Sequence, residues 1–197
     1  MKLIFATHNQ SKVEEMRALL KDAVIEVMSA DEAGVTDDVV EDGTTFEENA
    51  EIKARFVAQK SKEWAVADDS GCCVEALGGR PGIYSARFAG EGASGQAIID
   101  KLLTEMKDVP EGQRQAWFQT ALCLVAPDGK EWMFAGRVDG RISIQPQGQA
   151  RPKFPYDAVF IPEGHDRSFA EMSLEEKNAL SHRGRALAEL KKFLSTL

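Results

Sequence analysis

The chain has 197 residues, 43% of them hydrophobic, and a formal net charge of −8 at pH 7. That length is enough to bury a core and predicts one domain, residues 1–197, with room for two lobes. The negative charge argues against binding a nucleic acid polymer, which needs a basic face to displace counterions. No run of residues approaches the roughly 20 apolar residues of a membrane helix, and residues 1–6 turn polar too soon for a signal peptide.

The three cysteines, Cys72, Cys73 and Cys123, are an odd set without C-x-x-C spacing. They predict neither a disulfide framework nor a zinc site. This pattern favours a reducing compartment, so we expect a cytoplasmic protein that does not contact a membrane.

The N-terminal half alternates apolar runs with helical spacing. Val13, Met16 and Leu20 recur at the spacing of a helix that follows a short apolar strand. Thr45, followed three residues later by Glu48, is the signature of a capping box, so a long helix should begin there. The elements expected in this half are strands at 2–6 and 24–28, helices at 11–21 and from 45 to about 62, and a loop at 31–43.

The C-terminal half combines turn signals with two apolar runs that should pair. Pro-Asp-Gly-Lys at 127–130 is a hairpin turn signature between runs at 114–126 and 131–138, which predicts a long antiparallel pair. Seven glycines and a proline between residues 71 and 95 predict mostly turns. The other elements expected are strands at 65–67 and 156–161, a helix around 98–106, and two C-terminal helices, one opening at Ser173 and one carrying residues 187–194. This order predicts an α/β fold with a mixed sheet.

Residues 7–12 form a polar loop between the first strand and the first helix. Ser11 is placed to cap that helix, and the free backbone N–H groups there, together with Lys12, would attract an anion. The loop lacks the glycines of a Walker loop or of a dinucleotide fingerprint. Ordinary helix capping and a phosphate site are both open interpretations.

Two adjacent carboxylates, Asp68 and Asp69, follow the strand expected at 65–67. Carboxylates at a strand end are costly unless a cation or hydrogen bonds hold them. Mg²⁺ prefers a few carboxylates, several waters and substrate phosphate. Glu41, in the loop before the long helix, is a further candidate ligand. The alternative is that the two aspartates only cap a turn.

Three further groups could meet a nucleotide. Asn49 and Lys53 lie four residues apart on the capped helix and share a face, which is either solvated or directed at a bound anion. His182 and Arg183 open the last helix, where N–H groups and a guanidinium could bind a phosphate or a base edge. Phe154 and Tyr156 could stack on a base, although aromatic residues near a strand start more often belong to the core.

The order of these motifs resembles the inosine triphosphate pyrophosphatase family, which includes bacterial XTP/dITP diphosphatases, over essentially the whole chain. The matching stretches are residues 7–12, 41–46, 48–50, 53–54, 67–71, 76–87, 154–157 and 181–184. The resemblance implies an elongated, two-lobed α/β fold with a curved mixed sheet flanked by helices and an active-site cleft between the lobes. It also implies a homodimer.

The resemblance further implies a role for individual residues. Asp69 would accept the proton of the attacking water, and Glu41 and Asp69 would hold Mg²⁺. The triphosphate would be held by Thr7, His8, Asn9, Gln10, Ser11, Lys12 and Lys53. The other substrate-binding residues, with Phe154 stacked on the base, would be Ser70, Phe154, Pro155, Tyr156, Asp157, Lys177, His182 and Arg183.

The implied reaction is hydrolysis of a purine nucleoside triphosphate, ITP, dITP or XTP, to the monophosphate and pyrophosphate, which would remove deaminated purines from the nucleotide pool. Water would attack the α-phosphorus in line with the leaving pyrophosphate. Two alternatives stay open. One is a pyrophosphatase with different base specificity, Maf-like or directed at pyrimidines, and the other is a nucleotide-binding protein without turnover.

One stretch departs from the family pattern. Residues 152–158 read Pro-Lys-Phe-Pro-Tyr-Asp-Ala, where the family usually has Gly-Gly-Phe-Gly-Tyr-Asp-Pro. Proline cannot adopt the positive φ of glycine and has no N–H. The path of this loop must therefore differ if glycine used either property, and the consequence would fall on base recognition.

Overall fold

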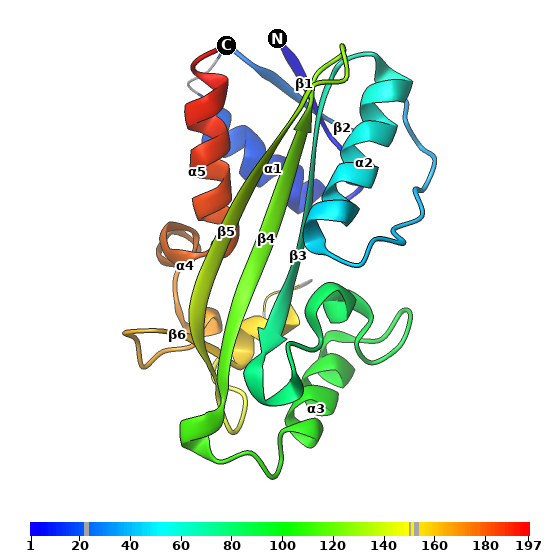
Figure 1. The fold of residues 1–197 in the computed structure, drawn as a ribbon. Coiled ribbons are helices and arrows are strands. Elements are labelled where there is room, and N and C mark those ends of the chain that lie inside the picture. Colours follow the sequence, from blue (N-terminus) through cyan, green and yellow to red (C-terminus); the bar gives the residue numbers. More distant parts are fainter. Residues whose placement is uncertain (22–23, 150, 152–153) are drawn as a thin grey trace. The chain divides into compact units, whose positions relative to one another are not determined.

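A computed structural model describes residues 1–21, 24–149, 151 and 154–197. Its strands are β1 (Lys2–Phe5), β2 (Glu26–Ser29), β3 (Trp64–Val74), β4 (Gln115–Val125), β5 (Glu131–Ile142) and β6 (Phe160–Pro162). They form one six-stranded sheet of order β2-β1-β3-β4-β5-β6 (Figure 1). β1 pairs in parallel with β2 and β3, whereas β5 and β6 are antiparallel. The predicted α/β fold with a mixed sheet is confirmed.

Helices flank this sheet (Figure 1). The described α-helices are α1 (Gln10–Leu20), α2 (Phe46–Ser61), α3 (Gly95–Glu105), α4 (Leu174–Leu180) and α5 (His182–Leu194). Short 3₁₀ helices are η1 (Glu75–Leu77), η2 (Gly82–Arg87), η3 (Glu111–Gln113), η4 (Pro155–Ala158) and η5 (Phe169–Glu171). Within the described parts of the chain, no helix combines the length and the apolar character needed to cross a bilayer.

The chain divides into two compact units. Unit 1 comprises Met1–Asp69, Thr120–Ala135 and Arg185–Leu197, and unit 2 comprises Ser70–Gln119 and Gly136–Gly184. Strands β3, β4 and β5 each contribute residues to both units.

The core of unit 1 lies between the sheet and helices α1 and α5. Side chains alternate along a strand, so Leu3 and Phe5 of β1 face this core while Ile4, also buried, belongs to the opposite face. The helical members of the cluster are Val13, Met16, Leu20, Ala186, Leu187, Leu190 and Leu194. Figure 1 shows α2 on the other side of the strands from α5.

The core of unit 2 is rich in aromatic side chains. Phe118 on β4 packs edge-on against Phe160, with ring centroids 4.7 Å apart, and lies 6.2 Å from Phe169. Ile98 and Leu102 of α3 belong to the same buried cluster. Residues 156 and 158–160 belong to the same cluster, so this packing holds the segment that carries the predicted site residues Tyr156 and Asp157.

Strand β3 is longer than the strand expected at 65–67. Asp68 and Asp69 lie within it rather than after it, and residues 71–74, expected as turn, continue it. Aspartate and glycine disfavour strands in isolation, so pairing within the sheet decides the conformation. Gly71 also permits a close approach, because a Cβ there would lie 2.2 Å from the Gly82 carbonyl oxygen.

The strand expected at 156–161 is wrong in its first half. Pro155 opens the 3₁₀ helix η4, and only Phe160–Pro162 is extended. Proline is suited to the first position of a helical turn, because its φ is already helical and its missing N–H has no partner to lose there.

Two capping predictions also need correction. Helix α1 begins at Gln10, and the Val13 N–H donates to the Asn9 carbonyl at 3.3 Å, so Ser11 lies inside the first turn and does not precede it. Thr45 caps α2 as expected, through a 3.1 Å bond from the Glu48 N–H. The Glu48 carboxylate, however, accepts from the Thr44 N–H at 2.6 Å, so the second bond of the box is made one residue earlier.

Candidate functional site

Lys12 of α1 forms an ion pair with Asp68 of β3 in unit 1. The Lys12 Nζ lies 2.7 Å and 2.9 Å from the two carboxylate oxygens of Asp68. The Asp68 side chain is only 1% exposed, and a buried carboxylate needs such a partner. Lys12 of the protein itself therefore supplies a cation for this aspartate.

Asp69 is held by a second set of partners. Its Oδ2 accepts from Asn49 Nδ2 at 3.1 Å, and its Oδ1 lies 3.8 Å from Lys53 Nζ. Lys53 Nζ also donates to Glu41 Oε2 at 3.0 Å. Lys53 thus bridges Glu41 and Asp69. We call Lys12, Glu41, Asn49, Lys53, Asp68 and Asp69 the carboxylate cluster.

Burial raises the pKa of the Asp69 carboxyl above its ordinary value. The Lys53 ammonium and the hydrogen bond from Asn49 oppose this shift, while the charges of Glu41 and Asp68 add to it. A carboxylate whose pKa is raised is a stronger proton acceptor when ionised. Its environment suits the predicted role of general base.

The carboxylates of the cluster are oxygen donors of the kind that hard divalent cations take as ligands. Among the described residues, no group of three or more His, Cys, Asp and Glu side chains is placed to hold a metal. Mg²⁺ does not need such a cage, because it keeps several waters and binds one or two carboxylates together with substrate phosphate. Glu41 and Asp69, both in contact with the same lysine ammonium, are a donor pair of this kind.

The loop before α1 carries the other residues predicted to hold the triphosphate. The Asn9 N–H donates to Thr7 Oγ1 at 3.1 Å, which shapes the turn into the helix. His8 Nδ1 lies 2.8 Å from Asp31 Oδ1, and both side chains are about half exposed. Gln10 is exposed at the first position of α1, and the side chain of Ser11 lies outside what the structure describes.

In unit 2, Asp157 is a buried carboxylate held by two cations. Its Oδ2 accepts from Lys177 Nζ at 2.6 Å and lies 3.3 Å from Arg151 Nη1. Arg151 also donates to the carbonyl oxygens of Phe169 and Met172, which ties η4 to the segment before α4. Burial lowers the pKa of the Lys177 ammonium, and the charge of Asp157 opposes that shift.

The Phe154 ring lies beside two cationic groups, Lys177 and Arg183. Lys177 Nζ is 4.2 Å from the ring centroid, and the Arg183 guanidinium carbon is 5.9 Å from it. Arg183 Nη2 also donates to Ser70 Oγ at 3.3 Å. We call Arg151, Phe154, Asp157, Lys177 and Arg183 the Phe154 cluster, and it combines an aromatic face with donors and an acceptor.

Three other predicted site residues of unit 2 contact neighbouring elements of the fold. The His182 ring stacks on Phe118, with centroids 4.9 Å apart and planes 10° from parallel. Tyr156 is buried, and its hydroxyl donates to the Ser85 carbonyl at 2.9 Å. Pro155 packs against the start of α3, since a Cβ on Gly95 would lie 3.2 Å from Pro155 Cβ. Of the stretch that departs from the family, Pro152 and Lys153 lie outside the described residues.

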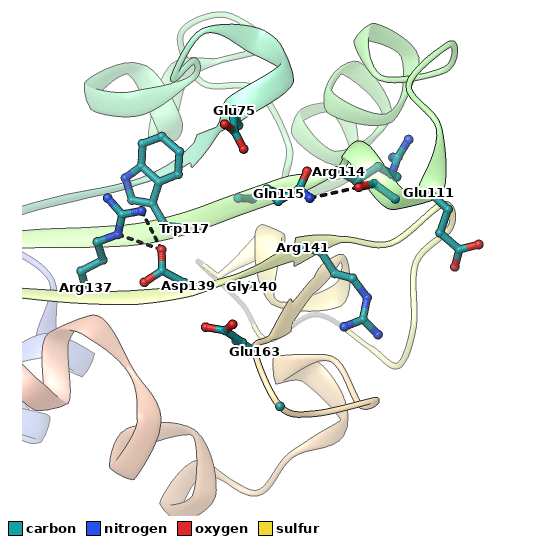
Figure 2. Close-up of a pocket in the computed structure, with 13 residues that line it drawn as sticks. Glu75, Glu111, Arg114, Gln115, Trp117, Arg137, Asp139, Gly140, Arg141 and Glu163 are labelled. Carbon is teal, nitrogen blue, oxygen red and sulfur yellow. Dashed lines mark hydrogen bonds and ion pairs between the residues drawn. The ribbon is translucent and has the colours of Figure 1, made fainter.

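Unit 2 also contains a cavity of about 700 Å³ that includes none of the predicted site residues (Figure 2). Arg137 stacks over Trp117 at 4.4 Å and pairs with Asp139 at 2.6 Å on one wall. On another wall the buried Arg114 donates to the backbone carbonyls of Ile142 and Met106. Both arginines are therefore held by neighbouring groups of the protein, Arg137 by Asp139 and Trp117 and Arg114 by backbone carbonyls.

The described chain is thus an α/β protein with one cluster rich in carboxylates and a second cluster that places cations beside an aromatic ring. Residues 3–193 match the Ham1 family, and the chain belongs to that family. It is 45% identical over 195 residues to a dITP/XTP pyrophosphatase of Caldanaerobacter subterraneus subsp. tengcongensis, covering 98% of this chain and 96% of that protein. For the dITP/XTP pyrophosphatase of Bacillus subtilis the identity is 44%, covering 97% and 96%.

Solved structures agree. A HAM1 protein from Coxiella burnetii has a TM-score of 0.92 and 36% identity, and the match covers 100% of both chains. A nucleoside-triphosphatase, or dITP/XTP pyrophosphatase, from Mycobacterium abscessus has a TM-score of 0.82 and 41% identity, covering 96% of this chain and 98% of that one. The family resemblance carried by the motifs is confirmed.

Proposed function

We propose that this protein hydrolyses non-standard purine nucleoside triphosphates, of the ITP, dITP or XTP type, to the monophosphate and pyrophosphate. The observation that carries the proposal is the carboxylate cluster, in which two lysines and three carboxylates gather in a chain related to dITP/XTP pyrophosphatases. A protein that only bound nucleotides would have no evident need for such a set of acids beside the cations.

In the proposed reaction, Asp69 takes a proton from water as the oxygen of that water bonds to the α-phosphorus. The bond between the α-phosphorus and the bridging oxygen breaks, and pyrophosphate leaves with the electron pair. Lys12 and Lys53 donate to phosphate oxygens, where negative charge accumulates in the transition state. In the structure both ammonium groups are paired with carboxylates, Lys12 with Asp68 and Lys53 with Glu41.

Glu41 and Asp69 would hold Mg²⁺. When bound, this ion neutralises charge on the phosphates and favours departure of pyrophosphate. Lys53 contacts both carboxylates in the structure, and it would turn towards phosphate oxygens when its two partners are engaged by the metal.

The Phe154 cluster would hold the base. The Phe154 ring offers a stacking face, and Lys177 and Arg183 offer donors that suit the 6-keto oxygen of hypoxanthine or xanthine. A 6-amino group, as in adenine, would place a donor against these donors. Guanine also has the keto group, so its exclusion would come from groups facing the purine 2-position, for which Asp157 and His182 are the candidates.

We also propose that residues 1–197 act as one functional domain. The protein would work as a homodimer in the cytoplasm. Analytical ultracentrifugation tests the dimer directly, with twice the mass of a single chain as the expected result and a single-chain mass as the contrary one.

The function is tested by initial rates on ITP, XTP, dITP, GTP, ATP and dUTP with Mg²⁺, assaying pyrophosphate and orthophosphate separately. Fastest pyrophosphate release from ITP, dITP or XTP is expected, with loss of turnover in Asp69→Asn. Asp42→Asn, an exposed acid in the same loop as Glu41, is the matched control and should keep full activity. Orthophosphate as the product, or no turnover of any nucleotide, would contradict the proposal.

A further inference from the structure

Asn49 is a buried polar side chain in the first turn of α2. Its residue is 2% exposed, although asparagine is mostly found at protein surfaces. Asparagine is also a mediocre helix former, because its amide competes with the backbone for hydrogen bonds. Such a residue is tolerated inside only if both ends of its amide are satisfied.

The two ends of the Asn49 amide bind two different segments. Oδ1 accepts from the Gly43 N–H at 2.9 Å, and Nδ2 donates to Asp69 Oδ2 at 3.1 Å. These partners also fix which atom is oxygen and which is nitrogen, since a backbone N–H needs an acceptor and a carboxylate needs a donor. The amide therefore links the loop before α2 to strand β3.

The glycine on the loop side allows the contact. A Cβ on Gly43 would lie 2.7 Å from Asn49 Oδ1, 2.8 Å from Glu48 Cβ and 3.0 Å from the Asn49 nitrogen. Any larger residue would push the loop away from the amide. Gly43 is two residues from Glu41, so the position of this backbone sets where the Glu41 carboxylate can reach.

Lys53 also touches Glu41 and Asp69, one turn further along α2. Its positive charge would be repelled by a divalent cation bound to the same carboxylates. The neutral amide of Asn49 meets no such repulsion, and it donates to Oδ2 of Asp69.

We propose that Asn49 is a positioning residue that holds Glu41, through the Gly43 backbone, and Asp69 in the geometry needed to bind a divalent cation. This inference rests on the proposed function, which gives the bound cation its purpose. The contacts of Asn49 with Gly43 and Asp69 are observed independently of that function. Partners of metal ligands matter in general, since changing them typically weakens metal affinity about 10- to 100-fold.

The test measures Mn²⁺ binding to the full chain from the loss of the free-ion electron paramagnetic resonance signal. Mn²⁺ is the probe because it takes oxygen ligands in the same octahedral geometry. Asn49→Ala removes the amide, and Gly43→Ala displaces it without altering either ligand. Both should raise the dissociation constant for Mn²⁺ about tenfold, while Gln59→Ala, which removes an exposed amide from the same helix, should leave it unchanged.

Thermal unfolding shows which variants are folded. If Asn49→Ala is not folded, Gly43→Ala alone provides the test. Excess Mg²⁺ should restore pyrophosphate release in either variant but not in Asp69→Asn. A dissociation constant within twofold of wild type in a folded variant, or no Mn²⁺ binding by the wild-type chain, would overturn the inference. If the wild type binds Mn²⁺ in an Asn49-dependent way yet releases no pyrophosphate, only the proposed function fails.

Discussion

The carboxylate cluster of unit 1 and the Phe154 cluster of unit 2 solve opposite electrostatic problems. In unit 1 the carboxylates outnumber the lysines, and Lys12, Lys53 and Asn49 hold them. In unit 2 the cations outnumber the single buried acid, Asp157, and an aromatic ring lies beside two of them. The first arrangement suits phosphate chemistry with a metal, and the second suits recognition of a planar base. Reaction and base selection should therefore respond to separate substitutions.

The largest effect is expected from Lys53→Met. Losing one cation that stabilises phosphate charge in the transition state should lower kcat by about 10²- to 10³-fold. The loss should be the same for every nucleotide, because phosphates are common to all of them. Lys60→Met, on the exposed face of the same helix, is the control. Steady-state rates of pyrophosphate release measure kcat for both variants. A fall in kcat for nucleotides of one base only would contradict the separation of reaction from base selection.

Phe154→Leu should act mainly on binding. Removing a stacking surface costs roughly 1–3 kcal/mol per base, so KM should rise about tenfold or more with little change in kcat. Phe56→Leu, which removes a ring that also lies beside a lysine but on α2, should leave both constants unchanged. A fall in kcat with KM unaltered would place Phe154 in the chemical step.

The pH dependence of kcat/KM offers a subtler test through Lys177. Burial lowers the pKa of its ammonium, Asp157 raises it, and Arg183 and Arg151 lower it. Lys177 is charged below its pKa, so Asp157→Asn should lower that pKa further and move the alkaline limb of the profile to lower pH. Arg151→Gln removes a neighbouring cation and should move the limb the opposite way. Equal alkaline limbs in wild type and both variants would exclude Lys177 from base recognition.

The smallest effect is expected at the cavity of Figure 2. Arg137 there is half exposed and is bound to Trp117 and Asp139. Arg137→Ala should change the free energy of unfolding by no more than about 0.5 kcal/mol and leave kcat/KM unchanged. Denaturant unfolding and steady-state kinetics measure the two. A clear fall in kcat/KM would extend the functional region beyond the two clusters.

The sequence predicted the order of elements well where periodicity or capping was strong. The hairpin turn is confirmed by the bonds between Ala126 and both Gly129 and Lys130, and the helix expected at Ser173 begins there with a complete capping box. Strand β3 was underestimated because neither Asp69 nor Gly71 favours a strand on its own. Their conformation depends on neighbouring strands, which local sequence does not reveal.

The residues of the candidate site were likewise predicted only where local sequence carried a signal. Asp69, Glu41 and Lys53 stood out by residue type and spacing, and the structure brings them together. Lys12 and Asp68 are 56 positions apart in the sequence, so no local pattern could predict that they pair. Arg151 gave no signal, since it lies outside every stretch that matches the family pattern. Its role on Asp157 follows only from the folded chain.

The most direct test of the division is the ratio of kcat/KM for ITP to that for GTP, measured in wild type, Lys53→Met and Asp157→Asn. We predict that Lys53→Met lowers both values and keeps their ratio, whereas Asp157→Asn changes the ratio by about tenfold or more, as expected when a buried polar group loses its role in discrimination. A ratio that shifts in Lys53→Met, or stays constant in Asp157→Asn, would contradict the assignment of reaction to one cluster and base selection to the other.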